Sequence, residues 1–173
     1  MSTKALLILA AILVVVTASI NLVFREPRDV RETKLQLSRA VALVQEVGAL
    51  EAAKEFKNQN SRWWWGERES QYFIVVRLST GGQLTGLNSK EGEEPDVRLV
   101  PPNKHGQAFG ALLYEAMSKT KEGYLSEVTY FAALPSDRGG PEYPKRMFVN
   151  KVGDFGVAIG LYDLSKPDPP PAR

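Results

Sequence analysis

The sequence predicts an α+β protein in which a long N-terminal helix packs on a central antiparallel sheet of about five strands, preceded by one transmembrane helix. Three observations lead to this prediction. Residues 5–24 are apolar, residues 28–58 show a helical pattern of apolar positions, and five β-type runs follow, joined mostly by hairpin-like turns. Strands joined by tight turns pair antiparallel, and helices then cover the faces of the sheet.

The apolar segment near the N-terminus predicts a membrane anchor. Residues 5–24 carry no charge, and a helix of this length crosses a hydrocarbon core of roughly 30 Å. Residues 1–4 would then be cytoplasmic, and the remainder would lie outside the cytoplasm. The alternative is a signal peptide cleaved after Val16-Thr17-Ala18, which would release a secreted protein. Val16 fits the small-residue cleavage pattern poorly and the apolar run continues to Phe24, so the anchor is favoured.

The next segment, residues 28–58, predicts one long helix. Apolar residues recur at helical spacing, among them Leu37, Val41, Val44, Val47 and Leu50. Gly48 weakens the helix where it occurs. The spacing of Leu37, Val41 and Val44 is compatible with a dimer seam, but only about two heptads fit. Docking on the protein's own sheet is therefore the favoured reading.

The remaining elements alternate between strands, turns and one further helix. We expect strands at residues 71–79, 83–87, 123–134, 146–151 and 155–162, a helix at 105–121, and loops at 88–102 and 135–144. The last two strands flank a tight corner at Val152-Gly153-Asp154, where glycine takes a positive φ and Asp154 can bond its own backbone. Residues 166–173 are proline-rich and are expected to be disordered.

Composition excludes several classes of function. The chain of 173 residues fits one domain with appendages, and it has 22 basic and 20 acidic residues without a polybasic run, so nucleic acid is not an expected partner. It has no cysteine, and its one histidine, His105, makes a poor metal site, for which a helix-start role is the better reading. No phosphate-binding loop, nucleophile elbow or histidine–carboxylate group is present. We therefore expect no catalysis, no metal and no cofactor.

Four groups of residues carry a family resemblance. They are residues 72–75, residues 81–84 with Glu91-Gly92, residues 122–124 with 128–130, and the closing segment from Pro144-Lys145 through Gly153-Asp154-Phe155 to Tyr162. Together and in this order they resemble the single-Cache type of the Cache family of extracytoplasmic sensor domains. The resemblance implies a PAS-like Cache fold over residues 28–165. It also implies a pocket on the sheet for a small ligand, such as an organic acid or an amino acid.

The resemblance singles out a set of ligand-contact candidates. Lys145 matches the family's Pro-Lys pair and would hold a carboxylate, while Tyr72 and Tyr130 on core strands would line the pocket. A contact from the second strand would come from Thr85 or Asn88, or would be absent. Of the three tryptophans at 63–65, one is expected to pack inward and one to cap the pocket, for which Trp65 is a candidate; an exposed one would suit a partner or membrane surface.

Two functions fit this sequence. The first is a membrane-anchored ligand-binding module whose state is read by another polypeptide, because the sequence ends soon after the hairpin where relatives continue into a signalling module. The second is a structural accessory subunit of a membrane complex, with a vestigial pocket and a protein partner. A homodimer is compatible with both.

Overall fold

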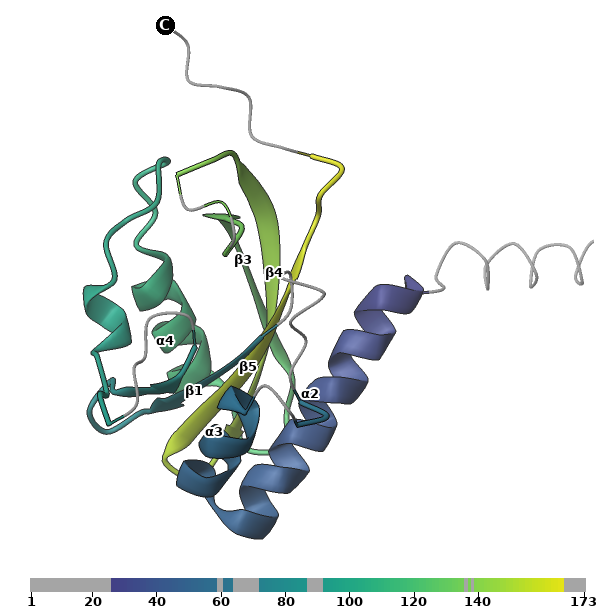
Figure 1. The fold of residues 1–173 in the computed structure, drawn as a ribbon, viewed down its shortest axis with the longest axis vertical. Helices are drawn as coiled ribbons and strands as arrows, with labels where there is room; N and C mark the ends of the chain where they lie inside the picture. The colour runs from purple at the N-terminus through teal and green to yellow at the C-terminus, as the bar shows by residue number, and fades with distance from the viewer. Residues whose placement is uncertain are drawn as a thin grey trace, which may run out of the picture. The chain divides into compact units, whose positions relative to one another are not determined.

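A five-stranded antiparallel sheet is the main element of the structure (Figure 1). The computed structural model describes residues 26–58, 61–63, 72–86, 92–135, 137 and 139–166. The strands are β1 (Phe73–Arg77), β2 (Gln83–Thr85), β3 (Ser126–Ala133), β4 (Glu142–Val152) and β5 (Phe155–Tyr162). They follow the order β2-β1-β5-β4-β3, and each neighbouring pair is antiparallel. The predicted class and sheet are confirmed.

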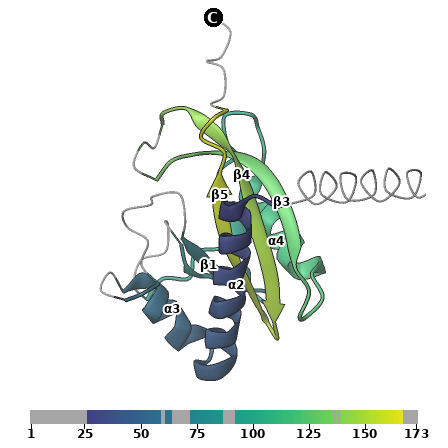
Figure 2. The same cartoon turned by 90° about the vertical axis from the view of Figure 1, so that its right-hand side faces the viewer.

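Helices lie on both faces of this sheet. They are α2 (Arg28–Val47), α3 (Ala49–Lys57), the 3-10 helix η1 (Val97–Leu99) and α4 (Phe109–Lys119). From Glu32 onward, α2 runs along one face, whereas α4 covers the opposite face (Figure 2). The first turn of α2 contains a backbone hydrogen bond of 3.1 Å from the N–H of Arg31 to the carbonyl of Pro27.

The single helix predicted over residues 28–58 is wrong, because two helices occupy that segment. Gly48 separates them with a φ of 83°, a backbone conformation that glycine adopts without steric cost. Val47 and Leu50, placed by the sequence on the buried stripe, lie beside this break and are 42% and 54% exposed. The sequence showed a weak point at Gly48 but did not show that the chain changes direction there.

Buried residues on α2 show which face of the helix is docked. Thr33, Leu37, Ala40 and Val44 are all buried and follow one another at steps of four, three and four. The ammonium of Lys34 lies 5.3 Å from the ring centroid of Phe148 on β4. Helix α2 therefore packs on its own sheet, as the sequence favoured, and Leu37 and Val44 are not available for a dimer seam.

The hairpin of β4 and β5 has the tight corner that the sequence predicts. Val152 pairs with Phe155 across Gly153 and Asp154, and Gly153 has a φ of 55°. One detail of the prediction is wrong. The Asp154 carboxylate does not bond its own backbone but accepts from the N–H of Ser79 at 2.9 Å and from the Ser79 hydroxyl. It thereby ties this corner to the end of β1.

Strand β4 is longer than predicted, because it starts at Glu142 inside the segment expected to be a loop. Proline normally interrupts a central strand because it lacks an N–H group. Pro144 is tolerated because it lies just beyond the last residue pair of β4 and β5, which joins Lys145 to Tyr162. The carbonyl of Pro144 still accepts a hydrogen bond of 2.8 Å from the N–H of Asp163. The expected loop at 88–102 likewise contains η1, and the predicted second helix is shorter at both ends.

Two groups of buried residues define the two faces of the sheet. The face that packs on α4, here called the α4 face, presents Ile74, Val76, Met147, Val149 and Ala158 against Leu113 and Met117 of the helix. The other face, here the α2 face, presents Phe73, Val75, Phe148, Val157 and Ile159. Within the described ranges, no helix is both long and apolar enough to cross a membrane. The predicted anchor at 5–24 lies outside these ranges.

Candidate ligand-binding site

A fully buried lysine lies on the α4 face of the sheet. Lys145 of β4 has no exposed surface, although lysine is almost never fully buried without a charged partner. Its Nζ donates to the hydroxyl oxygens of Tyr72 at 2.7 Å and Tyr162 at 3.3 Å. The same nitrogen lies 4.0 Å and 4.4 Å from the ring centroids of these two tyrosines. Lys145 is therefore enclosed and not solvated.

Strand register explains how these side chains meet. Successive residues of a strand point to opposite faces, so Lys145 shares the α4 face with Met147 and Val149. The two-residue turn at Gly153-Asp154 sets Lys145 directly opposite Tyr162. On its other side, Lys145 pairs with Tyr130 of β3. Tyr72 reaches the same spot from the residue just before β1.

The three tyrosines differ in how they are held. The hydroxyl of Tyr162 donates to the carbonyl of Ala133 at 2.9 Å. The ring of Tyr130 stacks on Phe109, at the start of α4, with the centroids 5.3 Å apart. Tyr72 is partly exposed, whereas Tyr130 and Tyr162 are buried. Tyr72 is therefore the member of this group that borders the surface.

Burial governs the electrostatics of the group. It lowers the pKa of Lys145 to about 7, because the charged form loses its hydration. Burial also raises the pKa of Tyr162 and of Tyr130, with smaller contributions from neighbouring tyrosines, so both hydroxyls stay neutral. In the described part of the chain, no carboxylate bonds to Lys145. A small anion bound at this position would therefore supply a negatively charged partner for the Lys145 ammonium.

Gly160 of β5 makes room for the lysine side chain. A Cβ added to Gly160 would collide with Cε of Lys145 and would lie 2.6 Å from Sδ of Met147. Gly160 lies on β5, the strand between β4 and β1, and the side chains of Lys145 and Met147 pass over it. Gly160 therefore decides whether Lys145 can reach Tyr72.

Replacing Gly160 with alanine is expected to lower the free energy of unfolding by about 1–3 kcal/mol, the usual cost of overpacking a close-packed site. Urea unfolding followed by circular dichroism measures this loss. The loss should shrink in a Lys145→Ala background, because the Cε that obstructs the new methyl group is gone. An equal loss in both backgrounds would show that Lys145 does not lie over Gly160.

Among the other predicted site residues, Thr85 and Trp63 lie within the described part of the chain. Thr85 is buried and pairs with Val75, so it lies on the α2 face and is not part of the Lys145 group. Trp65 and Asn88 lie outside the described residues. Trp63 packs inward as expected, with its ring centroid 5.4 Å from that of Phe56 and 5.8 Å from that of Phe73. Sequence reasoning missed Tyr162 as a partner of Lys145.

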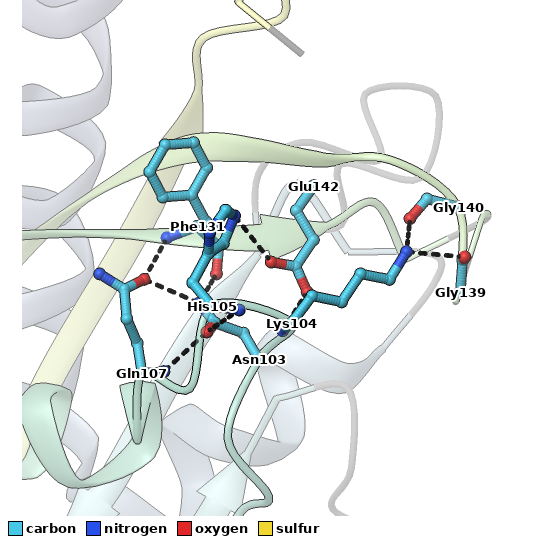
Figure 3. A network of polar contacts seen from close by, with 8 residues as sticks. All are labelled: Asn103, Lys104, His105, Gln107, Phe131, Gly139, Gly140 and Glu142. Atoms are coloured by element: carbon cyan, nitrogen blue, oxygen red, sulfur yellow. Dashed lines mark hydrogen bonds and ion pairs between the residues drawn. The ribbon is translucent and has the colours of Figure 1, made fainter. Parts of the chain in front are cut away.

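A second polar network fixes the loop before α4 to the β3–β4 end of the sheet (Figure 3). The side chain of Asn103 donates to the carbonyl of Phe131 at 2.8 Å, and Gln107 Oε1 accepts from the N–H of Phe131 at 3.1 Å. Glu142 accepts from the backbone N–H of Lys104 at 3.0 Å. Because Glu142 pairs with Ala133, this network also supports the carbonyl that holds Tyr162.

His105 belongs to this network and not to a helix start. It precedes the first residue of α4 by four positions, its ring lies 4.6 Å from that of Phe131, and its Nε2 is 3.7 Å from Glu142 Oε2. Among the residues with described positions, no group of three or more histidine, aspartate or glutamate side chains could hold a metal ion.

The chain is similar in fold to three solved structures of chemotaxis or chemosensory proteins. A periplasmic sensor domain of a chemotaxis protein aligns with a TM-score of 0.56 at 18% identity, over 77% of this chain and 94% of that one. A methyl-accepting chemotaxis protein from Vibrio parahaemolyticus gives 0.56 at 16% identity, over 78% and 88%. A Cache chemosensory domain studied for carboxylic acid recognition gives 0.55 at 16% identity, over 80% and 99%. The chain thus has the Cache-type sensor fold that the sequence predicted.

The sequence comparisons are negative. No protein-family model matches the chain, and no curated protein sequence is similar to it. The sequence identity to the solved structures is low, so the similarity establishes the fold alone and does not identify a ligand.

Proposed function

We propose that this protein is a sensor domain that binds a small carboxylate at Lys145, on the α4 face of its sheet. The observation that carries the proposal is the complete burial of a lysine that, within the described residues, donates hydrogen bonds to two tyrosine hydroxyls. A buried charge normally has a partner of opposite sign. A ligand carboxylate is the simplest group that would complete this site.

The chemistry of the surroundings fits a short carboxylate. An ammonium and a tyrosine hydroxyl can both donate to carboxylate oxygens, and charge-assisted hydrogen bonds of this kind are short and strong. Met147, Ile74 and Ala158 give the same face an apolar floor for the rest of the ligand. Small-molecule sites usually have an apolar lining with a small number of polar groups. Carboxylic acid recognition by the Cache chemosensory domain described above is consistent with this choice.

We also propose a location for the domain. Residues 28–165 would form one ligand-binding domain on the periplasmic side of the inner membrane, held there by residues 5–24. The apolar character of that segment and the similarity in fold to a periplasmic sensor domain support this arrangement.

Isothermal titration of the purified full chain with acetate, propionate, pyruvate and succinate tests the binding proposal. We expect at least one of them to bind, and Lys145→Met to weaken that binding by about 30-fold or more, because removing one partner of a buried charged contact costs at least about 2 kcal/mol.

A matched control is available on α4. Lys119 is exposed and pairs with Glu115 on the same helix, so Lys119→Met should bind like the wild type. If the folded wild-type protein bound none of the four acids, or if Lys145→Met bound them equally well, the proposal would be wrong.

A further inference from the structure

Within the described residues, the side chains that meet Lys145 on its own face of the sheet are tyrosines. The hydroxyls of Tyr162 on β5 and of Tyr72, just before β1, accept hydrogen bonds from Lys145. Tyr130 on β3 pairs directly with Lys145 across the strands. Tyr130 and Tyr162 stay neutral because burial raises the pKa of each hydroxyl. The amine therefore sits in a setting that disfavours its charged form.

Charged groups near this strand are engaged elsewhere. On β4 itself, Arg146 forms an ion pair with Glu127 on the α2 face, and Glu142 is held by Lys104 and His105. The residues of α4 that face the sheet here, Phe109, Leu113 and Met117, are apolar. Across the described segments that pack on Lys145, burial is consequently the cause of its lowered pKa of about 7.

From this arrangement we infer that ligand binding at Lys145 is coupled to the uptake of one proton. In the ligand-free protein above neutral pH, the side chain is a neutral amine held by Tyr72 and Tyr162. A carboxylate that enters beside it favours the ammonium, so the amine takes a proton from solvent, or from the acid form of the ligand, as the contact forms. The inference rests on the proposed carboxylate site and adds its regulation: the domain reports carboxylate and acidity together.

The sign and size of the effect follow from linkage. A group that gains a proton on binding makes the affinity fall as pH rises above the pKa of the free state. Since that pKa is about 7, the dissociation constant should change little below pH 6. It should approach a tenfold increase per pH unit above about pH 8. The number of protons taken up per ligand should be about 0.1 at pH 6 and about 0.9 at pH 8.

Calorimetry of the full chain with acetate and propionate, in MES and imidazole at pH 6 and in HEPES and Tris at pH 8, measures this number. Buffers with different heats of ionisation give different binding heats only when protons are exchanged. We expect a large buffer dependence at pH 8 and a small one at pH 6. The Lys119→Met variant should behave like the wild type, because the exposed lysine that it removes plays no part in the site.

The outcomes separate the inference from the proposed function. Binding with the same heat in both buffers at pH 8 would overturn proton coupling and leave carboxylate binding in place. No binding of acetate or propionate at either pH, by protein that is folded in circular dichroism, would overturn both. Proton uptake that is large at pH 6 and absent at pH 8 would also overturn the inference, because it would assign the proton to a more acidic group.

Discussion

Replacing Lys145 with methionine is expected to stabilise the ligand-free protein below pH 7 and to change how its stability depends on pH. The lysine pKa falls from 10.5 to about 7 on folding. A shift of this size corresponds to a cost of about 4–5 kcal/mol for burying the charged form. Methionine is apolar and similar in length, so it removes this cost and fills the same space over Gly160.

The pH window follows from the two pKa values. Below pH 7 the lysine is charged in both the folded and the unfolded chain, so the full cost is present. Between pH 7 and 10.5 the unfolded chain binds the proton that the folded chain has lost, and wild-type stability therefore rises with pH. Relative to Lys145→Met, the rise should reach about 1.4 kcal/mol per pH unit.

Urea unfolding of both proteins at pH 6.5, 8 and 9.5 gives this difference. We expect the advantage of the variant to shrink steadily across the series, while Lys119→Met tracks the wild type. Parallel curves for the wild type and Lys145→Met would contradict the burial of a titrating lysine.

Replacing Phe148 with alanine is expected to cost about 3–5 kcal/mol of folding free energy. Phe148 is fully buried on the α2 face, where Lys34 and the guanidinium of Arg146 each lie 5.3 Å from its ring centroid. Removing the ring opens a cavity between α2 and the sheet. Phe148 points away from Lys145, so the affinity of the folded protein for its carboxylate should stay within about twofold, since distant sites behave additively.

Met147 provides the matched comparison, because it is the neighbouring residue, equally buried, and on the α4 face. Met147→Ala should lose about 2–5 kcal/mol and should also weaken carboxylate binding, since its sulfur lies over Gly160 beside Lys145. Unfolding curves and titration calorimetry at a temperature where both variants are folded separate these effects. Equal losses of affinity in the two variants would show that the faces of the sheet are not independent.

Local sequence patterns predicted which segments form helices and strands better than they predicted the residues at which these elements begin and end. The tight corner at Gly153-Asp154 and the docked face of α2 follow from turn chemistry and helical spacing, which are properties of short segments. The separation of α2 from α3 at Gly48 depends on what each helix packs against. A helical period does not contain that information.

The site was only partly predictable for a similar reason. Tyr162 could have been found, because a two-residue turn fixes the register and places it opposite Lys145. Tyr130 could not be paired with Lys145 in this way, since a longer loop joins β3 to β4 and leaves the register open. The burial of Lys145 depends on Gly160, Tyr72 and Tyr162 together, which no local pattern records. Thr85 was assigned to the site although its register with Val75 turns it to the other face.

The proposed site places a carboxylate at the Nζ of Lys145. A crystal structure of the full chain with the acid that binds most tightly in calorimetry would show the ligand's position. We predict a carboxylate oxygen about 2.8 Å from this nitrogen, with the Tyr72 hydroxyl donating to the ligand in place of its present role as acceptor. Ligand density at another surface, with Lys145 still bonded to Tyr72 and Tyr162, would contradict the account.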